Sequence, residues 1–354
     1  MNKAKSEISP ISEKPFKRRV RYKGTHPIKF SEKYKELSPE NYGEDVEKVI
    51  ARGDTPAGSH RSICVQEILE VLSPKPGEIA VDCTLGYGGH AVEILTALLP
   101  GGRLFGLDTD PIEIAKTEAR FRSYGFSSEV FIPRHINFAG LPKLLEEDAK
   151  DGFDIALADL GVSSMQLDNP DRGFTFKGNG PLDMRMNPSR GASAALFLER
   201  ISEKRLVAIL QENADEPEAE AIASTLGLRR GKIQTTRDLS KAVKDALDHK
   251  NMSELDITKA VRRTFQAIRI EVNGEFSALY TLLARLPECM KSGGRIAILT
   301  FHSGEDRRVA RSFMEGHEAG LYRSISESPI FPSPEEKYSN PRARSACLRW
   351  AVKA

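Results

Sequence analysis

A short stretch in the middle of the chain combines a carboxylate, a glycine, a hydroxyl and an amide, which are groups that can bind a polar ligand. An apolar run at 155–158 leads into Asp159, and Gly161, Ser163 and Gln166 follow it. Such a run is typical of a buried strand, and ligands of open α/β sheets bind beyond the carboxyl ends of strands. We therefore expect a ligand site in which Asp159 and Ser163 accept hydrogen bonds.

A second stretch is rich in glycine and stands where a strand is expected to lead into a helix. Gly88 and Gly89 let the backbone approach a ligand closely, and His90 opens the helix, whose N-terminus favours polar or anionic groups. Asp108 follows Gly86 by 22 residues and ends the next expected strand. A carboxylate there can accept both hydroxyl protons of a ribose. These residues predict a site for a nucleoside-bearing cofactor.

Two cofactors fit the glycines alone. Gly86-x-Gly88-x-x-Ala91 satisfies the fingerprint of dinucleotide binding. Asp82 lies in the same loop, and its carboxylate would repel a pyrophosphate but suits a ligand with an amino group. The loop therefore favours S-adenosylmethionine over NAD, and the remaining alternative is a glycine-rich turn without a ligand.

Strands and helices alternate around these motifs. The pattern predicts a parallel, doubly wound α/β sheet. The expected strands are 79–81, 103–107, 129–133 and 155–158, and the expected helices are 90–99, 111–121 and 141–148. Two later strands are expected at 295–301 and 347–352.

The alternation breaks after the Asp159 stretch, and the pattern becomes helical. Residues 171–270 are interpreted as an all-helical insertion inside a cofactor-binding domain made of 58–170 and 271–354. Residues 1–57 form a basic extension. Its run from Lys14 to Lys23 carries six cations with interleaved aromatic residues, which is typical of an RNA-binding arm. A solvated tail is the alternative.

Composition excludes several classes of protein. The chain has 354 residues, 40% hydrophobic and 29% charged, which is an ordinary globular composition. Its four cysteines form no CxxC pair, so we expect neither a zinc site nor any other metal. Neither a secretory signal nor a run of about 20 apolar residues is present. We expect a cytoplasmic protein without a membrane partner.

The motifs taken together, and in this order, resemble the bacterial 16S rRNA cytosine N4-methyltransferase H family, also called the MraW family. The resemblance runs from about His60 to the C-terminus. The matching segments begin at Asp82, Gly106, Asn137, Asp159, Arg172, Gly180, Arg263, Phe301 and Asn340. Departures, such as His60-Arg-Ser-Ile63 before the first helix, indicate a divergent branch or a second paralogue.

The resemblance implies S-adenosylmethionine-dependent methylation of the exocyclic N4 of a cytidine in the decoding region of 16S rRNA. It implies a class I methyltransferase fold, Rossmann-like and doubly wound, in which the inserted helical domain at 171–270 recognises RNA. The small ribosomal subunit is the implied partner, and the family suggests a homodimer. The implied cofactor contacts are Gly88, Gly89, His90, Asp108, Phe138, Asp159 and Gln166.

Cytosine N4 is a poor nucleophile because its lone pair is delocalised into the ring, so the enzyme must position the amine and accept one of its hydrogens. Asp159, Ser163 and the carbonyl of Leu160 are the candidate acceptors. Asp159 could instead serve the cofactor alone. No aromatic residue directly follows Asp159, so stacking on the base is assigned to Phe174 and Phe176, each with a core role as the alternative.

The remaining substrate candidates are cationic or titratable. Arg185, Arg263 and Arg269 suit phosphate contacts, although a salt bridge is the alternative for each. His302 ends a late strand and could face the site or be structural. Two other functions stay open: an amino-methyltransferase acting on another RNA or on DNA, and an inactive ribosome assembly factor.

Overall fold

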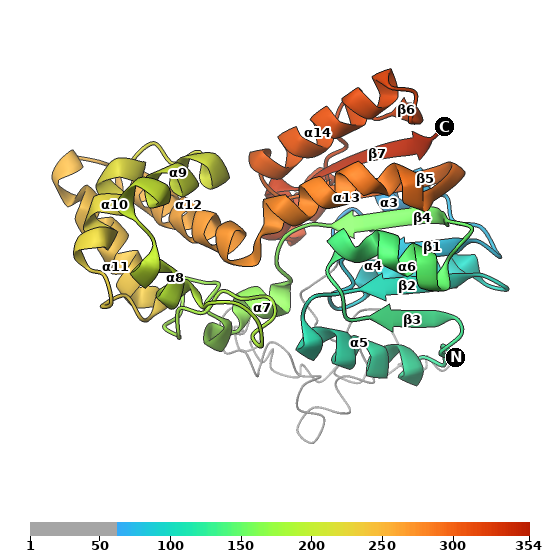
Figure 1. The fold of residues 1–354 in the computed structure, drawn as a ribbon, viewed down its shortest axis with the longest axis horizontal. Coiled ribbons are helices and arrows are strands. Elements are labelled where there is room, and N and C mark those ends of the chain that lie inside the picture. The colour runs from blue at the N-terminus through green and yellow to red at the C-terminus, as the bar shows by residue number, and fades with distance from the viewer. Residues whose placement is uncertain (1–61) are drawn as a thin grey trace, which may run out of the picture.

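The computed structural model describes residues 62–354, and the expected basic extension at 1–57 lies outside this range. Within it, a seven-stranded sheet carries helices on both faces (Figure 1). No helix in the described residues is long and apolar enough to cross a bilayer.

The sheet has the strand order β3-β2-β1-β4-β5-β7-β6. β1 (Ile79–Asp82), β2 (Arg103–Leu107), β3 (Phe131–Arg134), β4 (Phe153–Asp159) and β5 (Met290–Thr300) are mutually parallel. The α/β fold expected from the alternating pattern, and the class I methyltransferase type implied by the resemblance, are confirmed.

One edge of the sheet is antiparallel, a feature that the sequence pattern did not specify. β7 (Cys347–Lys353) lies between β5 and β6 (Tyr322–Ile325) and pairs antiparallel with both. The crossover through α14 (Ser303–Glu318) leaves a gap one strand wide beside β5, and the C-terminal strand enters this gap from the opposite end. The sequence pattern did not predict α14 or β6.

Two apolar layers hold the helices against the sheet. On one face, α3 (Val65–Leu72), α4 (Gly89–Leu98) and α5 (Pro111–Ser123) pack through residues such as Leu72, Ile94 and Phe121. On the other face, α6 (Leu141–Asp148), α13 (Glu275–Cys289) and α14 pack through residues such as Leu144 and Leu283. Both faces are covered, as a parallel sheet requires.

After α7 (Ser164–Asp168), five α-helices that precede α13 form a separate layer, here called the helical lobe (Figure 1). They are α8 (Ala194–Arg200), α9 (Glu203–Ala214), α10 (Ala219–Leu228), α11 (Thr236–Leu247) and α12 (Glu254–Asn273). Their apolar faces build a core of their own. Hydroxyl N-caps such as Ser202, Thr235 and Ser253 accept the first helical N–H groups.

The remainder of the described chain, which contains the β-sheet, is here called the sheet lobe. On the C-terminal side of the helical lobe, a single residue joins the two lobes. Gly274 has φ 60°, a conformation that favours glycine, and it stands between the end of α12 and the start of α13. The preceding Asn273 binds the segment that leads into the helical lobe. Its Oδ1 accepts the Met186 N–H and its Nδ2 donates to the Met184 carbonyl, each at 2.7 Å.

Candidate active site

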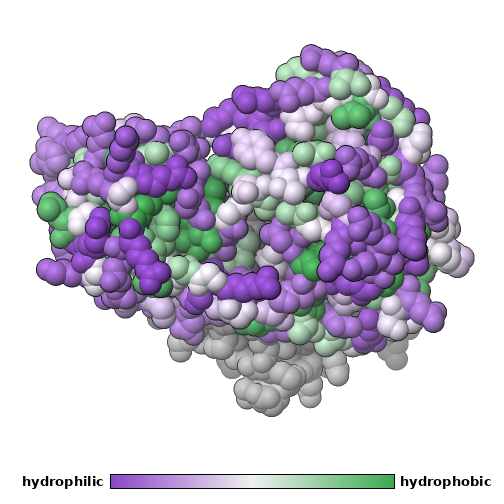
Figure 2. All heavy atoms as spheres, viewed as in Figure 1, coloured by the Kyte–Doolittle hydropathy of each residue, from purple (hydrophilic) through white to green (hydrophobic). Residues whose placement is uncertain are grey.

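A cavity of about 820 Å³ opens where the two lobes meet. Its walls come from the loops after β1, β2, β4 and β5, from α12 and α13, and from residues 174–177. Hydrophobic residues gather in the hollow between the lobes in Figure 2. The carboxyl ends of the parallel strands thus supply one side of the cavity, as expected for an open α/β sheet.

The loop after β1 is held by the carboxylate that ends the neighbouring strand. Asp108 Oδ2 accepts the Gly86 N–H at 2.7 Å, and its Oδ1 accepts the Asp110 N–H at 2.8 Å. Each oxygen keeps a further acceptor position. Burial raises the pKa of Asp108 to about 6. Gly88 has φ 83°, and a Cβ there would lie 2.6 Å from the ring of Phe121.

Gly88 is the N-cap of α4, and Gly89 and His90 form its first turn along the cavity. As a glycine, Gly88 has no side chain with which to cap this helix end. The backbone N–H groups of a helix start and the positive end of its dipole therefore face the cavity.

Asp159 and His90 face each other across the loop. His90 Nε2 lies 2.9 Å from the carbonyl oxygen of Ile63. A carbonyl only accepts, so Nε2 carries the ring proton and Nδ1 is the free acceptor of the neutral ring. This Nδ1 lies 3.5 Å from Asp159 Oδ2. The Asp159 backbone N–H donates to Thr84 Oγ1 at 2.6 Å, which fixes the end of β4 against the loop.

The pKa shifts of the two groups each favour the neutral form. Burial, with a smaller contribution from the Glu305 carboxylate, raises the pKa of Asp159 to about 7. Burial lowers the pKa of His90, although the Ile63 carbonyl and Asp82 oppose that shift. A neutral Asp159 can donate its proton to Nδ1, and an ionised Asp159 can accept from a ligand.

Asp82, an expected cofactor contact, lies beneath the loop and does not line the cavity. Its Oδ1 accepts the Thr84 N–H at 3.0 Å, and burial raises its pKa to about 6. In this position Asp82 supports the loop and adds negative potential behind His90 and Asp159.

Ser163 and Gln166 form a capping box at the start of α7 (Ser164–Asp168) and both line the cavity. Ser163 Oγ accepts the Gln166 N–H, and Gln166 Oε1 accepts the Ser163 N–H. The Gln166 amide also donates to Asp110 Oδ2 at 2.8 Å. The Ser163 hydroxyl keeps its own proton to donate, whereas the Gln166 oxygen and one amide proton are already bonded.

The three expected aromatic residues take different positions. Phe138, at the start of a 3₁₀ turn capped by Asn137, lines the cofactor end of the cavity. Phe174 lines the cavity but is buried in the core of the helical lobe. Phe176 is half-buried, lines the cavity, and packs edge-on against Phe265 of α12 with ring centres 5.6 Å apart.

Two of the three arginines expected to bind substrate lie away from the cavity in ion pairs. Arg185 pairs with Asp183 at 2.6 Å, and Arg263 pairs with the buried Glu216 at 2.8 Å. Arg269 does line the cavity but pairs with Glu275 at 2.9 Å.

His302 also lines the cavity, as the N-cap of α14. Its Nε2 lies 3.2 Å from Glu305 Oε1 without hydrogen-bond geometry. Burial would raise the pKa of Glu305, but His302 and Arg269 lower it below its usual value. An ionised Glu305 therefore faces Asp159 from the α14 side.

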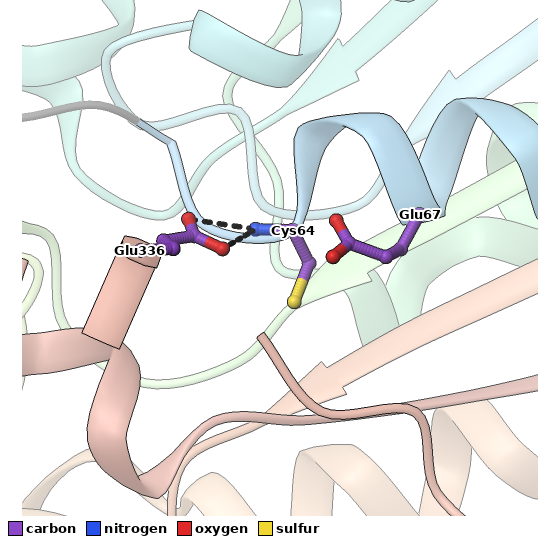
Figure 3. Close-up of side chains that lie close together, drawn as sticks. All are labelled: Cys64, Glu67 and Glu336. Carbon is purple, nitrogen blue, oxygen red and sulfur yellow. Dashed lines mark hydrogen bonds between the residues drawn. The ribbon is translucent and has the colours of Figure 1, made fainter. Parts of the chain in front are cut away.

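Cys64, Glu67 and Glu336 gather beside this site (Figure 3), with their ligand atoms within 4.8 Å of one another. Burial raises the pKa of the Cys64 thiol to about 12, so the thiol keeps its proton at neutral pH. Glu336 accepts the Cys64 backbone N–H at 3.1 Å. This contact ties α15 (Pro334–Ser339) to the start of α3, and a structural role accounts for the cluster.

Comparison with known proteins decides the family. Residues 57–354 match the model of the MraW methylase family. The chain belongs to this family. It is 52% identical over 344 residues to "Ribosomal RNA small subunit methyltransferase H 1" of Lachnoclostridium phytofermentans, covering 96% of this chain and 93% of the relative. It is 51% identical over 342 residues to "Ribosomal RNA small subunit methyltransferase H 2" of Alkaliphilus metalliredigens, covering 95% of this chain and 97% of the relative.

This MraW-family chain is an S-adenosylmethionine-dependent methyltransferase, and its residues fit that methyl donor. Asp108 and Asp159 line the cofactor end, Asp82 lies behind it, and every described cavity-lining lysine or arginine comes from outside the loops after β1, β2 and β4. Such a wall attracts a sulfonium and an ammonium group and repels a pyrophosphate. The remaining acceptor positions of Asp108 suit a ribose diol.

Several contributors were not found from the sequence. Thr84 lies inside the glycine loop. Its position two residues after Asp82 is the sequence feature that could have identified it. Asp110 caps α5 and also joins it to α7, because its carboxylate accepts from the Gln166 amide. Glu305 and Phe265 stand inside family-like segments, but only the fold brings them to the cavity.

Proposed function

We propose that this methyltransferase transfers a methyl group to the exocyclic N4 of a cytidine in the decoding region of small-subunit ribosomal RNA. The names of its relatives supply the RNA class. One observation supports the chemistry: Asp159, at the end of β4, lines the same cavity as the glycine loop, to which we assign the cofactor, and the Phe176–Phe265 pair, to which we assign the base.

The reaction forms a bond between N4 and the methyl carbon and breaks the bond between that carbon and sulfur, whose electron pair stays on sulfur. S-adenosylmethionine supplies the electrophilic methyl group. The protein has to hold the amine in line and withdraw one N–H into a hydrogen bond, so that the nitrogen lone pair is directed at the methyl carbon. Positioning of this kind is worth up to roughly 7–11 kcal/mol.

Asp159 is the acceptor that fits this requirement best. In its ionised form it accepts an amine N–H, and after methyl transfer it takes the proton that N4 releases. His90 Nδ1, 3.5 Å from Oδ2, then shares that proton. Charge is conserved, because sulfur loses its positive charge and the His90–Asp159 pair gains a proton. Ser163 can donate or accept a second hydrogen bond.

The target base is expected to leave its stack and enter the cavity beside Phe176 and Phe265. Phe176 fits the stacking role better than Phe174, because Phe174 is largely committed to the core of the helical lobe. A cytoplasmic location and a substrate presented within the small ribosomal subunit go with this proposal, and a homodimer stays a prediction.

The experiment is mass-spectrometric mapping of 16S rRNA from a strain lacking this gene, complemented with wild type, Asp159→Asn or Ser163→Ala. We expect loss of one N4-methyl group in the deletion strain and in Asp159→Asn, and restoration by wild type. An unchanged decoding-region cytidine in the deletion strain refutes the proposed target. Loss of 30S assembly with no change in methylation indicates an assembly factor instead.

A further inference from the structure

Five cationic side chains from lysine and arginine line the cavity, and they fall into two groups. Arg269 pairs with Glu275 at 2.9 Å, and Arg342 pairs with Asp168 at 2.7 Å. The other three, Lys177, Arg262 and Arg344, are exposed and form no ion pair in the described part of the chain. The paired cations are neutralised within the protein, and these three are available to an anion from outside.

The three unpaired cations surround the mouth from both lobes. Lys177 follows Phe176 directly, on the loop that leads into the helical lobe. Arg262 precedes Phe265 by one turn on α12, so both side chains project from the same helix face. Arg344 comes from the 3₁₀ turn Pro341–Ser345 of the sheet lobe.

Two segments that are far apart in the sequence thus each bring an aromatic ring and a cation to the cavity. Phe176 and Phe265 are in contact with each other, and each has an unpaired cation beside it. Single-stranded nucleic acid is bound by this combination, because bases stack on rings while phosphates pair with cations. An acidic peptide would satisfy the cations and leave the rings without a partner of matching shape.

We propose that Lys177, Arg262 and Arg344 bind the phosphates flanking the target base, so that a single strand of RNA crosses the cavity mouth between the lobes. This inference rests on the proposed function and adds the path of the substrate. It moves phosphate binding away from Arg185 and Arg263, since Asp183 and Glu216 already neutralise those two side chains.

The test is the salt dependence of RNA binding, measured by fluorescence anisotropy with a labelled, cytidine-containing single-stranded RNA oligonucleotide. For single strands the slope of log K against log salt changes by about 0.7 for each phosphate contact. The triple variant Lys177→Gln, Arg262→Gln, Arg344→Gln should lower the slope by about 2 and raise the KM for 30S subunits.

The matched control is Lys259→Gln. Lys259 is also exposed and lies on α12, three residues before Arg262, but it pairs with Asp256 at 2.9 Å. It should leave the slope unchanged. Affinity for S-adenosylmethionine without RNA reports whether the triple variant is folded.

The outcomes separate the two proposals. Wild type that neither binds the oligonucleotide nor methylates 30S subunits refutes the proposed function, and this inference with it. Wild type that binds and methylates RNA, together with a folded triple variant of unchanged slope, overturns only the assignment of these three cations.

Discussion

The affinity of the protein for S-adenosylmethionine should fall as the pH falls through the pKa of Asp159. The cofactor is a cation at sulfur and at its amino group, so it binds better to the ionised carboxylate. Burial raises the pKa of Asp159 to about 7. Affinity is therefore full above this pH and is lost below it.

The magnitude follows from proton linkage. About nine-tenths of Asp159 is ionised near pH 8 and about a quarter near pH 6.5, so the Kd should rise roughly fourfold across this interval. Several other titratable groups surround the pair. The neighbouring groups are Asp82 on β1, Asp108 after β2, Glu93 on α4, Glu305 on α14 and Glu336 on α15. Burial raises the pKa of Asp82 and of Asp108 to about 6, so both stay mainly ionised in the interval.

The assay is isothermal titration calorimetry at several pH values, with S-adenosylmethionine and S-adenosylhomocysteine compared. Asp159→Asn should remove the dependence between about pH 8 and pH 6.5. His90→Gln keeps a donor for the Ile63 carbonyl but removes the Nδ1 acceptor, so protonated Asp159 loses its partner and the midpoint should move to lower pH.

S-adenosylhomocysteine has no charge at sulfur but keeps the amino group. If the affinity for S-adenosylhomocysteine does not change with pH, Asp159 acts on the sulfonium of the cofactor. If that affinity falls with pH as the affinity for S-adenosylmethionine does, Asp159 acts on the amino end. A level affinity for S-adenosylmethionine in the wild type would refute the proton-sharing pair.

Two further predictions concern stability, measured by thermal and urea unfolding. Arg172→Gln should lower the free energy of unfolding by about 3 kcal/mol, because it leaves the fully buried Asp110, which lies 2.7 Å from the guanidinium, without its charge partner. Lys259→Gln breaks an exposed pair and should lower the free energy of unfolding by less than about 1 kcal/mol. Gly88→Ala should cost about 1–3 kcal/mol more than Gly125→Ala. Both glycines have positive φ, but only the Cβ at position 88 meets an aromatic ring at 2.6 Å, so equal losses would disprove the steric argument.

Local patterns predicted the central part of the fold well. The strand 103–107 and the helix 141–148 coincide with β2 and α6, because each has a clear apolar period and a glycine or proline at its boundary. The edge of the sheet was harder. β6 is only four residues long, and nothing local distinguishes a parallel from an antiparallel neighbour for β7.

The site shows the same division. Residues on one short loop, such as Gly88 and His90, or at a strand end, such as Asp159, were found because their spacing alone implies a common position. Partners that lie far apart in sequence were not. The Ile63 carbonyl that sets the tautomer of His90 is 27 residues away, and Glu216, which neutralises Arg263, is 47 residues away. Sequence identifies a cation, but only the fold shows whether it is already paired.

The loop after β2 links the cofactor end of the cavity to the helical lobe. Asp108 holds the glycine loop, and two residues later Asp110 accepts from Gln166 and from Arg172, whose guanidinium also donates to the carbonyls of Arg185 and Met186. The Asp110 N–H donates in turn to Asp108. A ligand that displaces Asp108 must therefore act on the same bonds that orient the entrance of the lobe. The cofactor end of the cavity and the segment that leads into the helical lobe are therefore held by one connected set of hydrogen bonds, and substitutions at Asp110 should affect both.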